Sequence, residues 1–348
     1  MQSLSSNRKI SKVIGFLLLT ASIFWIGFRF GMQTSSVGLL DGIRGFTLIL
    51  LSILLEALPF VLLGIIVSSV IQVFITEEMI LKIMPRNHFL RLMFASLVGL
   101  IFPVCECAII PITRGLIKKG MPIGPAIAFM LATPIVNPIV LLSTYNAFPT
   151  MPLMMPLRAA CGLIGAVAIG ALVGRAKSND VLKESITTVC SCGEHCHNEN
   201  SSGCQSKRKR DLFLDVLHHT STELQGVGAY LIFGAIIAAG VQSFVPAKFL
   251  TGIGSGEITS ILVMMGLAYL LSLCSEADAF VANTFLYQFS GASVLAFLIV
   301  GPMIDIKNTF MMLGSFKKRF TARLIITILV VCFALALASS LLIGGFYG

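Results

Sequence analysis

The stretch IFPVCECAIIPITR, residues 101–114, places two thiols and a carboxylate inside an apolar segment: Cys105, Glu106 and Cys107. A carboxylate inside a bilayer costs about 2.5 kcal/mol or more, so it indicates a functional site by default. Residues two apart on a helix point to nearly opposite sides, so both thiols can face one ligand only where the backbone is broken or extended. Pro103 and Pro111 are expected to supply that break and to prevent one continuous helix.

The composition is that of a polytopic membrane protein. The chain has 348 residues, of which 56% are hydrophobic and 12% charged, and its mean hydropathy is +0.93. Several apolar runs approach the ~20 residues that are needed to cross a bilayer. The net charge of +9 comes from short basic clusters at segment ends, where they set membrane topology, so we expect no nucleic-acid partner. The nine cysteines lie mostly in apolar spans and two special clusters, which argues against a disulfide scaffold.

The chain divides into four parts on this pattern. They are an N-terminal span with an outer loop at 1–41, a first repeat at 42–174, a hydrophilic linker at 175–211 and a second repeat at 212–348. The repeats match at offsets of 168 to 170 residues, where Gly64 falls on Gly234, Cys105 on Cys274, and Asn137 on Asp305. Two polar, broken apolar segments related in this way are typical of secondary transporters, whose binding site lies at the repeat interface.

The basic clusters decide how the broken segments cross. If residues 90–113 crossed fully, Arg114 and the basic cluster at 207–210 would lie outside. If this segment enters and leaves on one side, every basic cluster up to Arg319 lies in the cytoplasm. We therefore expect an all-α fold with seven full spans and two re-entrant hairpins, at 90–113 and 259–287. The hairpins belong to two inverted repeats with three full spans each, and nine full spans is the alternative.

Four polar clusters are expected to converge as a substrate-binding site inside the membrane. They are Cys105, Glu106 and Cys107; Thr133, Pro134 and Asn137; Cys274, Ser275, Glu276 and Asp278; and Pro302 with Asp305. Prolines in spans free backbone carbonyls, which are tolerated at depth only when they are buried or line a cavity. Glu56 is placed at an interface instead, and Lys307 and Asn308 are candidate partners of Asp305.

Thiolates and carboxylates in one cavity select a soft or borderline cation, or a trivalent metalloid that bonds sulfur. Carboxylates alone would serve as a proton relay. The chain has no GxxxxGK[ST] loop, so ATP-driven pumping would need another subunit.

The hydrophilic linker carries a second set of soft ligands: Cys190, Cys192, His195, Cys196, His197 and Cys204. Their density is typical of a metal-capture tract for Zn²⁺ or Cu⁺, although they lack the paired spacing of a zinc finger. The alternative is a disordered linker whose cysteines stay reduced. No other cofactor is expected.

Four segments carry a family resemblance: CECAIIPITRGLIKKGMP, AFMLATPIVNPIVLLST, CSEADAF and GPMIDIKN. They resemble the predicted permeases of the YraQ type, a family that includes the ArsP permeases for organic arsenicals. The resemblance covers about residues 42–345 and implies an integral, multi-pass permease of the bacterial inner membrane. For the ArsP branch it implies efflux of trivalent methylated arsenic, while a metal cation stays open as the substrate of this chain.

Three hypotheses for function follow. The first is a secondary transporter, not an enzyme, that exports a thiophilic metal, metalloid or organoarsenical, with three cysteines as soft ligands and the acids as charge or proton partners. The second is a thiol–disulfide electron carrier that uses Cys105 and Cys274. The third is a membrane anchor for a metal-sensing loop at 190–204. The expected partners are the lipid bilayer and a small ion or metalloid, and a homo-oligomer is left open.

Overall fold

The structure is a computed structural model that describes residues 39–74, 84–85, 87–100, 104–175, 181–183, 209–244 and 256–347. Apart from one isolated bridge between Leu182 and Phe316, these residues form helices and their connections. The all-α prediction is therefore confirmed. The N-terminal span expected within residues 1–41 and the soft-ligand tract at 190–204 lie outside the described residues.

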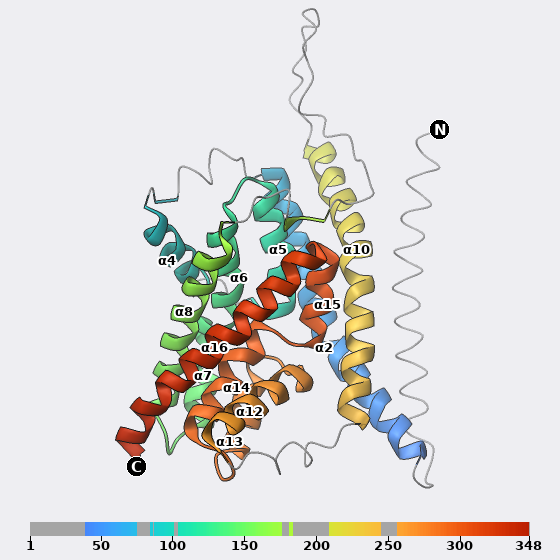
Figure 1. Ribbon diagram of the computed structural model, residues 1–348. Coiled ribbons are helices and arrows are strands. Elements are labelled where there is room, and N and C mark those ends of the chain that lie inside the picture. The colour runs from blue at the N-terminus through green and yellow to red at the C-terminus, as the bar shows by residue number, and fades with distance from the viewer. Residues whose placement is uncertain are drawn as a thin grey trace, which may run out of the picture.

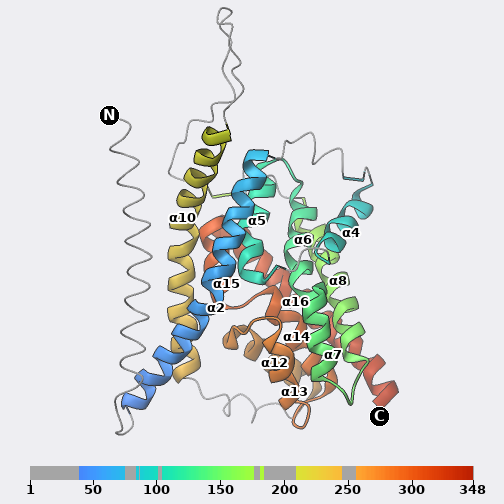
Figure 2. The ribbon, with the colours of Figure 1, turned by 180° about the vertical axis from the view of Figure 1, so that it is seen from behind.

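The helices follow one another in two sets (Figures 1 and 2). The first set is α2 (Leu39–Phe74), α4 (His88–Val98), α5 (Glu106–Lys118), α6 (Ile123–Val136), α7 (Pro138–Ala147) and α8 (Met154–Val173). The second set is α10 (Lys209–Phe244), α12 (Glu257–Leu271), α13 (Ala277–Thr284), α14 (Gly291–Met303), α15 (Ile306–Ser315) and α16 (Lys318–Tyr347).

Four helical stretches are long and apolar enough to cross a membrane: Arg44–Ile71, Met154–Val173, Gly291–Ser315 and Lys318–Leu341. Helices α6 and α7 together form a fifth candidate, bent by 40° at Asn137. The apolar part of α10, Val227–Ser243, is shorter than these spans. The described residues thus hold four or five candidate spans, as a polytopic membrane protein requires.

The two segments expected to be re-entrant are each broken near their centre. Helix α4 ends at Val98 and α5 begins at Glu106, while α12 ends at Leu271 and α13 begins at Ala277. The longest of these four helices has 15 residues, so none is long enough to cross a bilayer alone. Figures 1 and 2 show α4 and α5 in the upper half of the molecule and α12 and α13 in the lower half.

The prediction that Pro111 interrupts the helix after Cys105 is wrong. Helix α5 continues through Pro111, just as α6 contains Pro134 and α14 contains Pro302. Helix α5 packs against both α2 and α6, and tertiary packing of this kind compensates for the one backbone hydrogen bond that a proline removes. The chain is therefore broken before Glu106, not within the helix that follows.

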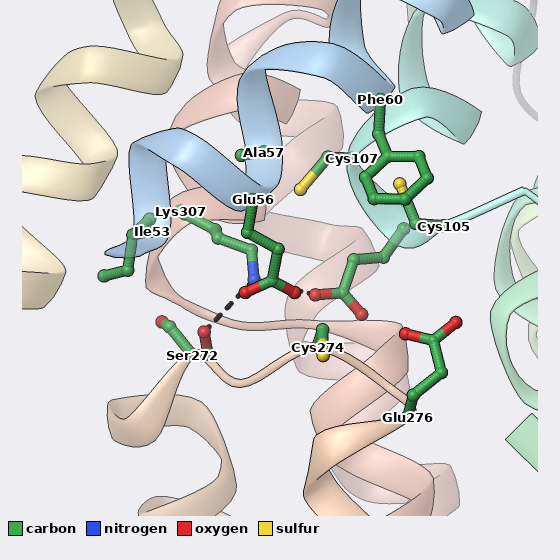
Figure 3. A pocket seen from close by; sticks show the side chains of 11 residues that line it. Ile53, Glu56, Ala57, Phe60, Cys105, Cys107, Ser272, Cys274, Glu276 and Lys307 are labelled. Atoms are coloured by element: carbon green, nitrogen blue, oxygen red, sulfur yellow. Dashed lines mark hydrogen bonds and ion pairs between the residues drawn. The ribbon is translucent and has the colours of Figure 1, made fainter. Parts of the chain in front are cut away.

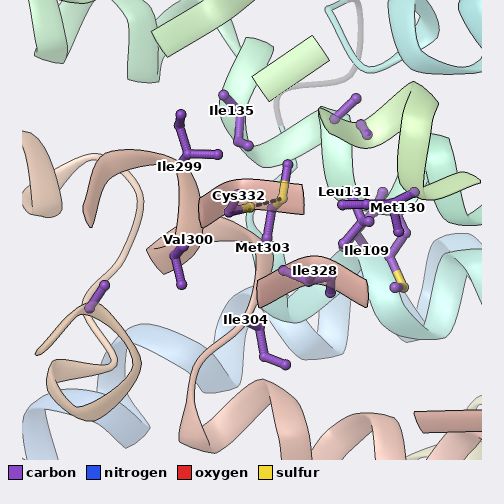
Figure 4. Packing of buried hydrophobic residues seen from close by; sticks show 14 of the residues in the cluster. Ile109, Met130, Leu131, Ile135, Ile299, Val300, Met303, Ile304, Ile328 and Cys332 are labelled. Atoms are coloured by element: carbon purple, nitrogen blue, oxygen red, sulfur yellow. Dashed lines mark hydrogen bonds between the residues drawn. The ribbon is translucent and has the colours of Figure 1, made fainter. Parts of the chain in front are cut away.

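The core lies around α6 and α14. Every residue of α6 is buried, and α14 packs against α6, α8 and α16. Figure 4 shows part of this packing, with labelled side chains that include Met130 of α6, Met303 of α14 and Cys332 of α16. The outer helices α2, α8 and α16 instead expose large apolar side chains, which is the surface that contact with lipid requires.

Helix contacts recur between the two halves. Helix α4 packs on α6 as α12 packs on α14, α6 on α8 as α14 on α16, and α5 on α15 as α7 on α13. The contacts of α2 and α10 differ, because α2 lies on α5 whereas α10 lies on α15. A glycine permits each approach: a Cβ on Gly64 would lie 2.6 Å from the Ala108 carbonyl oxygen, and one on Gly234 would lie 3.0 Å from Lys307 Cα.

Candidate functional site

One pocket collects thiols and carboxylates from both halves of the chain (Figure 3). Its polar lining consists of Glu56, Cys105, Glu106, Cys107, Ser272, Cys274, Glu276 and Lys307. Five of the residues predicted for the site are among them: Cys105, Glu106, Cys107, Cys274 and Glu276. Glu56 of α2 lines this pocket too, although the sequence placed it at an interface.

Lys307 joins the two halves at this pocket. Its Nζ atom lies 2.8 Å from Glu106 Oε1 and 3.1 Å from Asp305 Oδ2, and it donates a hydrogen bond to the Ser272 carbonyl at 3.1 Å. All three charged side chains are buried. The cation from α15 therefore offsets part of the cost of burying two carboxylates, one of them from the first half.

The backbone around the pocket is also specialised. Ser272, which follows the last residue of α12, has a φ of 44° and is the one non-glycine residue with positive φ among the described residues. Such a conformation costs about 1–3 kcal/mol and is typical of functional sites. Here it accompanies the hydrogen bond between the Ser272 carbonyl and the ammonium group of Lys307.

Three helices begin at or beside the pocket. Helix α5 begins at Glu106, α13 follows Glu276, and α15 follows Asp305, whose Oδ1 accepts a hydrogen bond from the Asn308 amide at 2.6 Å. The N-terminal end of a helix carries a partial positive charge, which stabilises an acidic side chain there. The breaks in the helices thus place each acid where its negative charge is favoured.

A second buried ion pair lies outside the pocket. Arg158 of α8 places Nη2 2.9 Å from Asp278 Oδ2 and 3.2 Å from the Ser275 carbonyl oxygen, and its Nη1 donates to Thr144 Oγ1 at 2.7 Å. Sequence reasoning missed Arg158. The available signal was a single arginine inside the apolar run 153–174, because an ionised residue within a span is expected to have a buried partner.

The cluster of Thr133, Pro134 and Asn137 does not join the pocket. Thr133 donates its hydroxyl to the Phe129 carbonyl within α6. Asn137 lies at the bend and accepts a hydrogen bond from the Ile139 amide, which caps α7. The structure therefore brings together the clusters around Cys105, Cys274 and Asp305, and leaves this one apart.

The thiols of the pocket form no disulfides. Cys105, Cys107 and Cys274 are all free cysteines. Within the described ranges, no group of three or more His, Cys, Asp or Glu side chains is placed to hold a metal ion. The soft atoms are thus available to a ligand that enters the pocket.

Comparisons with known proteins identify a family of predicted permeases. The ArsP_1 family model, described as a predicted permease, matches residues 42–341. The UPF0718 protein YcgR of Bacillus subtilis is 46% identical over 298 residues, which are 85% of this chain and 96% of that protein. A Streptococcus mutans protein named putative two-component membrane permease complex subunit is 43% identical over 272 residues, 78% of this chain and 87% of its own.

The UPF0718 protein YraQ of Escherichia coli is 28% identical over 111 residues, 32% of each chain. No solved structure matches. Permeases move solutes and do not convert them, so the activity class is transport rather than catalysis. The chain belongs to this family of predicted permeases and is a multi-pass protein of the cell membrane.

Proposed function

We propose that the chain is a secondary permease that exports a thiophilic metal, metalloid or organoarsenical through the pocket between its halves. The observation that carries this proposal is the pocket lining itself, in which three thiols lie beside the carboxylates of Glu56, Glu106 and Glu276. Thiolates select soft cations and metalloids that bond sulfur, and carboxylates add the negative charge that attracts a cation. An apolar solute would need neither group.

Two inverted repeats would give this pocket access to both sides of the membrane. The recurring helix contacts support the repeat, as do the equivalent bends at Asn137 and Asp305, where each side chain caps the helix that follows. The helices of the broken segments α4–α5 and α12–α13 lie in the upper and lower halves of the molecule (Figure 1). In the proposed topology, each half contributes three full spans and one re-entrant hairpin, and rocking of one half against the other exposes the site alternately.

A thiol–disulfide electron carrier is the second candidate. It is favoured by one observation, since Cys105 and Cys274 come from opposite halves and line the same pocket. It gives no role to the ion pair between Lys307 and Glu106. A permease uses both sets of groups, so we prefer it.

Two further elements belong to the proposal. The tract at 190–204 would gather Zn²⁺, Cu⁺ or a similar thiophile at the cytoplasmic face before transport.

Because one relative is named as a subunit of a two-component complex, a second membrane subunit is proposed as a partner alongside the homo-oligomer left open by the sequence.

Uptake into everted membrane vesicles tests the function. Vesicles that contain the chain are given methylarsenite, Zn²⁺, Cu⁺ or sulfate, first with protonmotive force and then after its collapse. We expect accumulation of at least one thiophile, loss of that accumulation on collapse, and no accumulation of sulfate. The variant Cys161→Ser serves as the control, since this thiol lies in α8 away from the pocket. Equal signals from vesicles with and without the chain for every thiophile would refute the proposal.

A further inference from the structure

A second cavity shares Glu106 with the thiol pocket. Its lining includes three methionines from three different helices, Met130 of α6, Met303 of α14 and Met312 of α15, together with Glu106 and Asn308. A hydrogen bond also connects the linings of the two cavities. The thiol of Cys107, which lines the thiol pocket, donates to Asn308 Oδ1 of the second cavity at 3.9 Å. A solute that leaves the thiols thus meets thioethers next.

Methionine often fills gaps in a core, because its side chain is flexible. Filling alone does not explain a buried carboxylate at the same cavity. Glu106 is 3% exposed, and while its Oε1 atom pairs with Lys307, its Oε2 atom has no hydrogen-bond partner among the described residues. A buried anionic oxygen without a donor is costly, and a bound cation would satisfy it.

We propose that this cavity is a second binding site for the transported solute and that it takes a soft monovalent cation such as Cu⁺. The inference rests on the proposed function and narrows its substrate class. Thioether sulfur coordinates Cu⁺ well, whereas a trivalent arsenical forms an As–S bond with a thiol, which loses its proton as the arsenical loses hydroxide, and a thioether has no proton to lose in this way. The carboxylate of Glu106 would balance the single positive charge of Cu⁺.

The surroundings hold the thioethers in place. The thiol of Cys332 in α16 donates to Met303 Sδ at 3.6 Å, as the dashed line in Figure 4 shows. Met303, Met130 and Met312 are all at most 4% exposed. A cation at this site would therefore be shielded from water, and its stability would depend on sulfur and on Glu106. The cavity and the thiol pocket together form a two-step path for a soft cation.

The purified full-length chain in detergent, labelled with ¹³C at methionine methyl groups, tests the site with Ag⁺ as a stable analogue of Cu⁺. We expect Ag⁺ to shift the methyl resonances of Met130, Met303 and Met312 and to leave that of Met311 unchanged. Met311 is the matched control, because it is buried beside Met312 but does not line the cavity. The same shifts should persist when Cys105, Cys107 and Cys274 are replaced by serine, which separates direct binding from an indirect effect of the thiol pocket. Unchanged resonances at saturating Ag⁺ would overturn the inference.

Transport by the triple variant Met130→Leu/Met303→Leu/Met312→Leu gives the functional arm. Leucine conserves volume and removes the sulfur, so folding should be retained. We expect Cu⁺ flux to fall about tenfold, which corresponds to about 1.4 kcal/mol, while Met311→Leu leaves it unchanged. If the wild type moves methylarsenite but neither binds Ag⁺ at these methionines nor moves Cu⁺, this inference fails and the proposed function stands. If the wild type moves no thiophile, the proposed function fails instead.

Discussion

Two buried ion pairs connect the halves of this permease, and they do so reciprocally. Glu106 of the first half pairs with Lys307 of the second, whereas Asp278 of the second half pairs with Arg158 of the first. Both cations also donate to a backbone carbonyl at the end of a broken helix, that of Ser272 or Ser275. The chemistry of the two clusters is thus nearly the same.

Their surroundings differ. Lys307 and Glu106 line the thiol pocket, where we propose that the solute binds. Arg158 and Asp278 are 0% and 2% exposed and line neither of the two cavities. A buried pair that no solute reaches can hold helices together, whereas a pair at a pocket can exchange its partner for a substrate. We therefore assign a structural role to the Arg158 cluster and propose a transport role for the Lys307 cluster.

In the proposed repeat, one sequence difference accounts for the cation at the thiol pocket. Lys307 lies two residues after Asp305, and the corresponding position after Asn137 is Ile139. Ile139 is 52% exposed. The first half thus has no cation at this position, and its arginine comes from α8 instead.

Removal of Arg158 should have the largest effect. Replacing one partner of a buried pair leaves the other charge uncompensated, which costs about 3–5 kcal/mol, so Arg158→Met should lower the melting temperature of the purified chain strongly. The double variant Arg158→Met/Asp278→Leu should recover most of that loss, because no buried charge remains. Thermal unfolding followed by circular dichroism measures both. An Arg158→Met chain that melts like the wild type but transports nothing would reverse the assignment of roles.

Removal of Lys307 should change both stability and transport, because it leaves two buried carboxylates without their counter-ion. In Lys307→Met, the carboxylates of Glu106 and Asp305 lose their built-in counter-ion, so a cationic substrate should bind more tightly and leave more slowly. We expect the apparent KM and the maximal flux each to fall about tenfold, or about 1.4 kcal/mol. Lys307→Arg keeps the charge and is the control. If KM rises while the maximal flux stays constant, Lys307 contributes only to binding.

Loss of a single pocket thiol should reduce flux at constant stability. Cys105→Ser removes a soft ligand at the start of α5, and we expect a reduction of about tenfold for a thiophile, or about 1.4 kcal/mol. Cys161→Ser, at a buried cysteine of α8, should leave both flux and melting temperature near those of the wild type. Vesicle uptake under identical expression compares them. Equal losses in both variants would point to general misfolding and against a pocket-specific role.

Deletion of residues 190–204 should have the smallest effect. If this tract gathers substrate outside the transport path, its removal should weaken apparent affinity by about threefold, or about 0.7 kcal/mol, and leave the maximal flux intact. Concentration dependence of uptake provides the measurement. Abolished transport by a correctly inserted deletion variant would make the tract part of the central path.

The sequence revealed the composition of the pocket better than its geometry. The break at Cys105 and the polar run at Cys274 could be predicted from the sequence, because packing alone does not require thiols and carboxylates in apolar segments. The ion pair of Glu106 could not be predicted from the sequence. Its partner Lys307 lies some two hundred positions further along the chain, and the packing of α5 against α15 places the two side chains in contact. The predicted helix break at Pro111 was wrong, because tertiary packing overrides the local preference of proline and α5 continues through this residue.

Long-range packing also explains why the structure separates Asn137 from the thiol pocket. Asn137 and Asp305 occupy equivalent bends, and sequence similarity between the halves suggested one shared site for both. Only Asp305 is followed by a lysine that reaches the pocket. Corresponding positions in the proposed repeat can each cap a helix, but their side chains can face different surroundings.

Flux through proteoliposomes with neutral isosteres of the pocket acids tests the central claim most directly. Glu106→Gln and Glu276→Gln preserve shape, but Glu106→Gln also breaks the buried pair with Lys307, so the melting temperature of each variant is measured alongside its flux to separate lost function from misfolding. With Cu⁺ and methylarsenite supplied in parallel, we predict that each variant loses at least about tenfold of the wild-type flux, or about 1.4 kcal/mol of transition-state stabilisation. Wild-type flux in both acid variants, with Cys105→Ser and Cys274→Ser inactive, would contradict the permease mechanism and favour the electron carrier.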